Sequence, residues 1–214
     1  MKYKTVIFDL DGTLLNTLED LAASVNYAMD KAGFPRRTIE EVRRFVGNGV
    51  RVLIRRSVPA GTSEERYNEA YDYFVKYYAE NSMNKTKPYD GIPELLKELN
   101  NMGIKTAVVS NKIDFAVKQL CRDFFGEFIH VAIGDCDDTE NKPAPDMVYK
   151  AVRELGCDIK DCVYVGDTDV DLETAANSGM DCISVSWGFR SREDLEGYGA
   201  AMIADKASDI IKYL

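Results

Sequence analysis

Short apolar segments that alternate with helix-like segments constrain the fold of this chain more than any other feature. The segment KTVIFDLDG is followed by TLEDLAASVNYAMDKAG, and GIKTAVVSN is followed by KIDFAVKQLCRDFFG. Further along, DCVYVGDTD precedes VDLETAANSGM, and DCISVSWG comes next. Apolar runs rich in Val and Ile, each followed by an amphipathic helix, are typical of a parallel sheet with helices on both faces. The sequence therefore predicts an α/β fold.

The alternation is interrupted by a long segment that contains no strand pattern. Between residues 17 and 84, apolar residues recur at helical spacing, as in IEEVRRFVGNGVRVLIRRSV and ERYNEAYDYFVKYYAENSM. The turn-rich NKTKPYDGIP follows and indicates a return to the first domain. We expect an α/β core formed by residues 1–14 and 87–214, with residues 15–86 inserted as a helical cap domain.

Composition and charge exclude several classes of function. The net charge of -9 argues against a general nucleic-acid binder, which would have a basic surface. No stretch approaches the ~18 consecutive apolar residues of a membrane span, and the apolar run near the N-terminus is too short for a signal peptide. Five scattered cysteines without a CxxC pair are typical of reduced thiols. We therefore expect a cytoplasmic protein with no nucleic-acid or membrane partner.

Positive charge is concentrated in the predicted insert. Eight of the twelve arginines fall between residues 36 and 66, against four glutamates there. This segment is therefore locally basic within an acidic chain, which suggests a lid that attracts anions. Such a bias is compatible with a small phosphorylated ligand.

Two aspartates, Asp9 and Asp11, follow the first predicted strand. Like charges this close repel each other and lose hydration when enclosed, so the pair costs free energy unless a cation lies nearby. Alternate residues of a strand point to the same side, so both carboxylates can face one site. Gly12 permits a sharp turn after them, and Thr13 offers a hydroxyl and an amide.

Polar residues also end two further predicted strands. Ser110 follows AVV, and Asp167 follows VYVG. The carboxyl ends of parallel strands meet at one edge of the sheet, so these side chains are expected to converge with Asp9.

The segment GDTDVDLE contains three alternating aspartates, which could belong to a calcium loop. A loop of the EF-hand type that begins at Asp167 requires glycine at its sixth position and glutamate at its twelfth. Those positions hold Leu172 and Ser178, so the calcium loop is excluded. Aspartates from separate strand ends instead suit Mg²⁺. Lys142, in ENKPAPD, could add a second positive charge.

Four segments of the chain, in order, resemble the signatures of the haloacid dehalogenase-like hydrolases. The similarity spans the whole chain, including the helical insert. DLAASVNYAMDKAGF, FVGNGVRVLIRR and SVSWGFRS are also similar to the phosphoglycolate phosphatase branch. The resemblance implies a Rossmann-like parallel sheet with an inserted helical cap domain. The four signatures are DLDGT (9–13), VVSN (108–111), KPAPD (142–146) and GDTDVD (166–171).

This resemblance implies phosphoryl transfer through a covalent aspartyl-phosphate. Asp9 would attack phosphorus. Asp11 would protonate the departing alkoxide and then deprotonate the attacking water. Lys142 would neutralise the nucleophile and the transferred group. The residues that would bind the phosphoryl group are Gly12, Thr13, Ser110, Asn111 and Lys142.

The resemblance also implies that the cofactor is Mg²⁺. Asp9, the main-chain carbonyl of Asp11, and Asp167 would hold the ion, with Asp171 as a further ligand or a support. Several carboxylates would repel a phosphate dianion, so Mg²⁺ and Lys142 must supply the compensating charge.

The resemblance implies that the substrate is a small phosphorylated metabolite, and its identity stays open. An aspartate at position 11 favours phosphate esters over dehalogenation, because a halide leaves without a proton. Phosphoglycolate is the leading expectation. Arg51 and Arg55, four residues apart on a predicted helix, are candidates for binding a substrate carboxylate.

Several alternatives share the same scaffold. A pyrophosphatase or a sugar phosphomutase would use the same nucleophile. A phospho-accepting signalling module is a more distant alternative, and the helical insert argues against it. His130, the one histidine, is expected to be structural because it falls within the predicted strand EFIHVAIGD. The sequence does not predict whether the protein is a monomer or a homodimer.

Overall fold

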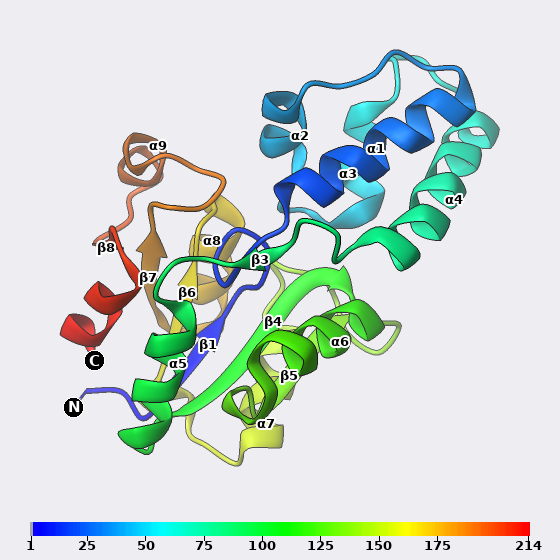
Figure 1. Cartoon of the computed structure of the whole chain (residues 1–214). Helices are drawn as coiled ribbons and strands as arrows, with labels where there is room; N and C mark the ends of the chain where they lie inside the picture. Colours follow the sequence, from blue (N-terminus) through cyan, green and yellow to red (C-terminus); the bar gives the residue numbers. More distant parts are fainter. Residues whose placement is uncertain (1) are drawn as a thin grey trace. The chain divides into compact units, whose positions relative to one another are not determined.

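The computed structural model describes residues 2–214 and divides them into two units (Figure 1). One unit comprises Met1–Leu15 and Pro88–Leu214, and we call it the sheet unit. The other comprises Asn16–Lys87, and we call it the helical unit. Each is described below by itself.

The chain crosses between the units at two short strands. β2 (Leu15–Asn16) and β3 (Lys87–Pro88) pair with each other as a two-stranded sheet. The division falls one residue later at each crossing than the boundaries of 15–86 expected from the sequence.

The sheet unit contains six strands in the order β5-β4-β1-β6-β7-β8, and their pairings are parallel. The predicted parallel α/β sheet is therefore confirmed. β1 lies at the centre, where Phe8 is opposite both Val108 of β4 and Val165 of β6. The segments that follow these three strands consequently begin at the same edge. The strands are β1 (Thr5–Phe8), β4 (Lys105–Ile113), β5 (Val131–Asp135), β6 (Cys162–Gly166), β7 (Asp181–Val185) and β8 (Met202–Ala204).

Both faces of the sheet are covered by helices (Figure 1). Val6 and Phe8 pack into one core, whereas Ile7 between them packs into the other, as the alternation of a strand requires. Full burial of each such side chain contributes about 1.5–3 kcal/mol to folding. The first face is covered by α5 (Ile92–Asn101), α6 (Asp114–Phe125) and the 3₁₀ segment η3 (Ala207–Tyr213), and the second by α7 (Asp146–Leu155) and α8 (Asp169–Ser178).

Three short elements complete the sheet unit. They are η1 (Gly126–Phe128), η2 (Ile159–Asp161) and α9 (Arg192–Gly197). Within residues 2–214, no helix combines the length and the apolar character needed to cross a bilayer.

The helical unit is built from four helices that pack around a common apolar core. α1 contacts each of the other three, and α4 also contacts α3. Buried residues of α1 and α4 recur three or four positions apart, which is the spacing of one helix face. The helices are α1 (Leu18–Ala32), α2 (Ile39–Phe45), α3 (Gly49–Ser57) and α4 (Glu64–Asn81).

Asp20 joins the beginning and the end of the helical unit. Its buried carboxylate accepts hydrogen bonds from the backbone N–H groups of Lys85 and Thr86, at 2.9 and 2.8 Å, and from the Thr86 hydroxyl at 2.8 Å. These charge-assisted bonds compensate for the burial of the carboxylate. The two ends of the insert are thereby held together within the unit itself.

Candidate active site

The site begins with the tight turn that follows β1. The Asp9 N–H donates to the Val165 carbonyl at 2.8 Å, so the β1–β6 hydrogen bonding continues one residue past the strand. Gly12 has a φ of 92°, and a Cβ there would lie 2.4 Å from an Asp167 carboxylate oxygen. Only glycine therefore allows the turn to pack directly against Asp167.

Three buried carboxylates converge at the edge of the sheet where β1 and β6 end. Asp9, Asp167 and Asp171 each offer a carboxylate oxygen, and these oxygens lie within 4.8 Å of one another. We call these three residues the acidic cluster, and Lys142 contacts two of them, Asp9 and Asp171. Its ammonium group is 2.9 Å from Asp9 Oδ1, 2.8 Å from Asp171 Oδ1 and 3.0 Å from the Tyr164 hydroxyl. The three N–H donors of the lysine thus have three acceptors.

The electrostatics of the acidic cluster favour protonation of Asp9 and Asp167 in the absence of a cation. Burial raises the pKa of Asp9 to about 7, although Lys142 opposes the shift. Burial, followed by the charges of Asp171 and Asp9, raises the pKa of Asp167 well above its usual range. Burial alone would lower the pKa of Lys142, but the two neighbouring carboxylates raise it well above its ordinary value. One ammonium group does not balance three carboxylates.

The donor set of the acidic cluster fits a hard divalent cation. Its ligand atoms are carboxylate oxygens, which Mg²⁺ prefers. Asp167 is oriented by the Thr13 hydroxyl, which donates to Oδ1 at 2.9 Å, and by the Phe189 N–H, which donates to Oδ2 at 2.7 Å. Fixing a ligating carboxylate through such outer contacts is characteristic of metal sites.

Asp171 differs from Asp167 because one of its oxygens accepts three hydrogen bonds and the other pairs with Lys142. Oδ2 accepts from the N–H groups of Asp167 and Thr168, at 3.1 and 3.0 Å, and from the Thr168 hydroxyl at 2.8 Å. Oδ1 accepts from Lys142. Asp171 thus stabilises the first turn of α8 and positions the lysine, which favours a supporting role for it.

The segment at the end of β4 differs from expectation in one respect. Ser110 does not follow the strand but lies within it, because β4 continues to Ile113 after a shift in register beyond Val109. The Ser110 hydroxyl accepts from the Lys112 N–H at 3.3 Å. The strand therefore carries its polar residues past the last position that pairs with β1.

Asn111 connects β4 to the loop that carries Lys142. Its side-chain amide donates to the Lys142 carbonyl at 3.0 Å, and its carbonyl oxygen accepts from the Lys142 N–H at 2.8 Å. This pair of bonds fixes the backbone of the lysine. The four predicted signatures are thereby brought together within the sheet unit.

Asp11 has a partner that the sequence analysis did not single out. The Lys112 ammonium contacts both Asp11 oxygens, at 2.8 and 3.0 Å, and the lysine side chain is only 3 % exposed. The carboxylate of Asp11 is therefore balanced by Lys112 and lies outside the acidic cluster. The position of Lys112 directly after the signature VVSN was the available signal, because an ammonium group buried there requires an acidic partner.

Two further residues that the sequence reasoning did not assign to the site support it. The Tyr164 hydroxyl, fully buried on β6, donates to the Val109 carbonyl at 3.2 Å and contacts Lys142. The indole N–H of Trp187 donates to the Thr13 carbonyl at 3.0 Å and so supports the turn after β1.

Arg51 and Arg55 belong to α3 of the helical unit. The guanidinium of Arg51 lies 4.7 Å from the centre of the Tyr71 ring, and that of Arg55 lies 3.5 Å from the centre of the Tyr67 ring. Arg55 also pairs with Glu64 at 2.7 Å. Both arginines thus stack on tyrosines of α4 within their own unit.

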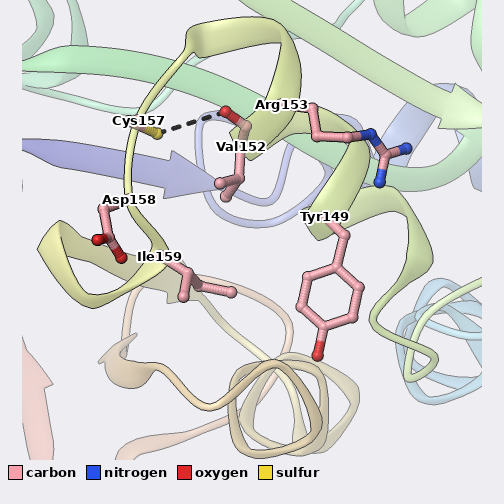
Figure 2. Close-up of a pocket in the computed structure, with 6 residues that line it drawn as sticks. All are labelled: Tyr149, Val152, Arg153, Cys157, Asp158 and Ile159. Atoms are coloured by element: carbon pink, nitrogen blue, oxygen red, sulfur yellow. Dashed lines mark hydrogen bonds between the residues drawn. The ribbon is translucent and has the colours of Figure 1, made fainter.

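A cavity of about 560 Å³ beside the end of α7 lies apart from the predicted residues (Figure 2). None of the predicted site residues lines it, and its lining residues carry no acidic cluster. Cys157 donates a weak hydrogen bond there to the Val152 carbonyl, at 3.7 Å. The cavity is lined by Tyr149, Val152, Arg153, Cys157, Asp158 and Ile159.

Residues 6–185 match the family model of haloacid dehalogenase-like hydrolases. This match covers most of the chain and includes all four signatures. The chain belongs to the haloacid dehalogenase-like hydrolases. The predicted family is therefore confirmed, and the hydrolase is an enzyme of the phosphatase type, similar to the phosphoglycolate phosphatase branch.

Named relatives and a solved structure support this placement of the hydrolase. A phosphoglycolate phosphatase of Pseudomonas syringae pv. tomato is 31% identical over 214 residues, covering 97% of this chain and 78% of its own. An N-acetylmuramic acid 6-phosphate phosphatase of Pseudomonas aeruginosa is 30% identical over 216 residues, covering 100% of this chain and 96% of its own. A crystal structure from Lactobacillus delbrueckii subsp. bulgaricus is 38% identical, with a TM-score of 0.94 over 98% of this chain and 97% of that one.

Proposed function

We propose that the protein is a Mg²⁺-dependent phosphatase that hydrolyses a small phosphorylated metabolite through an aspartyl-phosphate on Asp9. Phosphoglycolate is the first candidate substrate, because relatives of that name are similar over almost the whole chain. One observation carries the proposal. Asp9 is buried beside Lys142, which contacts only its Oδ1, and Oδ2 has no hydrogen-bond partner among residues 2–214.

In the proposed first step, Asp9 Oδ2 attacks phosphorus and the bond to the ester oxygen breaks. Lys142 neutralises the nucleophile and a phosphoryl oxygen. The Ser110 hydroxyl oxygen accepts a hydrogen bond from the backbone N–H of Lys112. Its own O–H can therefore donate to a second phosphoryl oxygen. The backbone N–H groups of Thr13 and Asn111 would bind the remaining oxygens, whereas the Gly12 N–H already donates to the Leu15 carbonyl at 2.9 Å. Fixed donors of this kind stabilise the charge of the transition state.

Asp9, Asp167 and the main-chain carbonyl of Asp11 would hold Mg²⁺. When bound, the ion supplies positive charge that offsets the repulsion between the carboxylates and a phosphate dianion. Asp171 supports this arrangement by holding Lys142 and the first turn of α8. The helical unit would act as the cap that excludes water during the first step and selects the leaving group.

Asp11 would act as general acid in the first step and as general base in the second. It would protonate the departing alkoxide and then deprotonate the water that attacks the phosphoenzyme. We expect Asp11→Asn to slow both half-reactions by about 10²–10⁴-fold, the usual contribution of a general acid–base. Rapid-quench measurement of phosphoenzyme formation and decay checks this. Asp209→Asn, which alters an aspartate of η3 paired with Lys212, is the control. Normal rates in Asp11→Asn would remove the proton-transfer role.

The substrate proposal is tested by phosphate release from a panel of phosphorylated metabolites in the presence of Mg²⁺. We expect the highest kcat/KM for phosphoglycolate. The panel includes N-acetylmuramic acid 6-phosphate, because a relative of that specificity is aligned over the full length of this chain. Pyrophosphate, nucleoside monophosphates and hexose phosphates are included too, with hexose phosphate isomerisation followed in parallel. Isomerisation faster than phosphate release would identify a mutase, and stoichiometric phosphorylation without turnover would identify a signalling module.

A further inference from the structure

We propose that Lys112 binds a carboxylate on the leaving group and so makes the enzyme selective for phosphate esters of hydroxy acids. This inference rests on the proposed function, because it uses Asp11 as the residue that contacts the ester oxygen. It gives a specificity role to a residue of the sheet unit, next to the residues proposed to bind the phosphoryl group.

The Lys112 ammonium lies close enough to Asp11 to contact a leaving group that is bound there. The Lys112 ammonium lies 2.8 Å from one Asp11 oxygen and 3.0 Å from the other. Whichever oxygen faces the ester oxygen of the substrate is therefore itself in contact with Lys112. With one more hydrogen bond of about 3 Å, the ammonium lies no further than about 6 Å from the ester oxygen. In phosphoglycolate the carboxylate is attached to the carbon that bears this oxygen, so rotation about the C–O bond can turn it toward the ammonium.

The negative charge of a leaving-group carboxylate also favours Lys112 as its partner. A leaving group with its own carboxylate adds a negative charge beside Asp11, which requires a nearby cation. Of the lysines that the structure describes, only Lys112 and Lys142 are buried. Lys142 is committed to Asp9, Asp171 and Tyr164 on the nucleophile side. Lys112 is therefore the ammonium group of the sheet unit that is placed on the leaving-group side.

One ammonium group can form ion pairs with two carboxylates at once. Lys142 does this in the same protein, with contacts of 2.9 Å to Asp9 and 2.8 Å to Asp171. Lysine carries three N–H donors, so Lys112 can keep one contact to Asp11 while another donor turns from Asp11 to a second carboxylate. The Lys112 N–H bond to the Ser110 hydroxyl holds this segment beside the phosphoryl-binding residues.

The test compares two substrates that differ only in charge. Phosphoglycolate and its amide, in which a carboxamide replaces the carboxylate, have the same number of non-hydrogen atoms. We expect the wild-type enzyme to prefer the acid. We expect Lys112→Met to lower kcat/KM for the acid by at least about 30-fold more than for the amide, the usual effect of removing one partner of a buried charge pair. Lys112→Arg should retain part of the preference.

An equal loss on both substrates would show that Lys112 only positions Asp11 and would overturn the proposal. A wild-type preference for the amide, or none, would overturn it as well. Arg51→Ala is measured with the same two substrates. If this variant, rather than Lys112→Met, loses the preference, the carboxylate is bound by the helical unit.

Binding measurements keep the proposal testable if Lys112→Met is inactive on both substrates. Calorimetry with Mg²⁺ on Asp9→Asn and on Asp9→Asn/Lys112→Met gives the affinities for the acid and the amide without turnover. We expect the second change to weaken binding of the acid selectively, and equal weakening would contradict the inference. Failure of wild-type enzyme to release phosphate from either compound would instead refute phosphoglycolate as the substrate, which is a separate result.

Discussion

Replacing Asp9 by asparagine is expected to abolish phosphate release while leaving the protein folded. The amide has nearly the size of the carboxylate but cannot act as the nucleophile, so kcat should fall by about four orders of magnitude or more. Lys142 keeps its contacts to Asp171 and Tyr164, so the surroundings of residue 9 retain their hydrogen bonds. Steady-state phosphate release and a thermal melt of the variant check both parts of this prediction.

Asp9→Glu is the matched control for charge. It keeps a carboxylate beside Lys142 but displaces the nucleophilic oxygen by the length of one C–C bond. We expect this variant to lose at least about 10²-fold in kcat, because a displacement of about 1 Å at the reacting atom is enough to cost that much. Retained turnover in Asp9→Asn would show that another residue receives the phosphoryl group.

Mg²⁺ is expected to stabilise the protein, and more strongly near pH 8 than near pH 5. The pKa of Asp9 is about 7 in the folded, metal-free protein, and that of Asp167 is also raised, against about 3.9 in an unfolded chain. As the pH rises through this range, the unfolded chain loses its protons first, so the metal-free fold loses stability. The same rise removes the protons that compete with the ion for these carboxylates.

The expected size of this effect follows from linkage. At a Mg²⁺ concentration of about 100 times Kd, binding contributes about 2.7 kcal/mol, which for a chain of this length corresponds to about 5–10 °C in Tm. Asp167→Asn should abolish the shift and, without metal, should make the protein more stable near pH 8 by removing one charge from the acidic cluster. Asp161→Asn, which changes a half-buried aspartate that pairs with Lys4, is the control.

Chelation supplies the corresponding measurement of activity. EDTA should stop phosphate release, and excess Mg²⁺ should restore it. A Tm that does not respond to Mg²⁺ at either pH, together with turnover in EDTA, would rule out the proposed metal site.

The sheet could be predicted from the sequence because its strands are buried on both faces. Thr5–Phe8 forms β1 at the expected position, and the α/β architecture with a helical insert follows from the interruption of the strand–helix rhythm. The four signatures meet near one edge of the sheet, because parallel strands place their carboxyl ends there.

Local sequence patterns did not predict contacts between residues that are far apart in the sequence. Lys112 and Asp11 are 101 positions apart, so neither segment alone indicates that they form a pair. His130 was expected inside a strand but is exposed and precedes β5. The Thr106 N–H donates to Nδ1 of His130 at 3.3 Å. The pairing of β5 with β4 begins one residue later, at Val131 opposite Ala107.

The engagement of Asp171 could not be predicted either. An aspartate at the third position of a helix commonly accepts hydrogen bonds from the residues that start the helix. That geometry becomes visible only when α8 is seen to begin at Asp169, with Thr168 as its N-cap residue. Asp167 and Asp171, which alternate in the sequence, therefore have different structural roles.

The most direct test of the account is to identify the residue that carries the phosphoryl group. Enzyme quenched during turnover with Mg²⁺ is treated with borohydride, which reduces an aspartyl-phosphate to homoserine, and is then analysed by peptide mass spectrometry. The account predicts homoserine at position 9, and none in Asp9→Asn. Homoserine at position 11 or 167, or a phosphorylated His130 in its place, would contradict it.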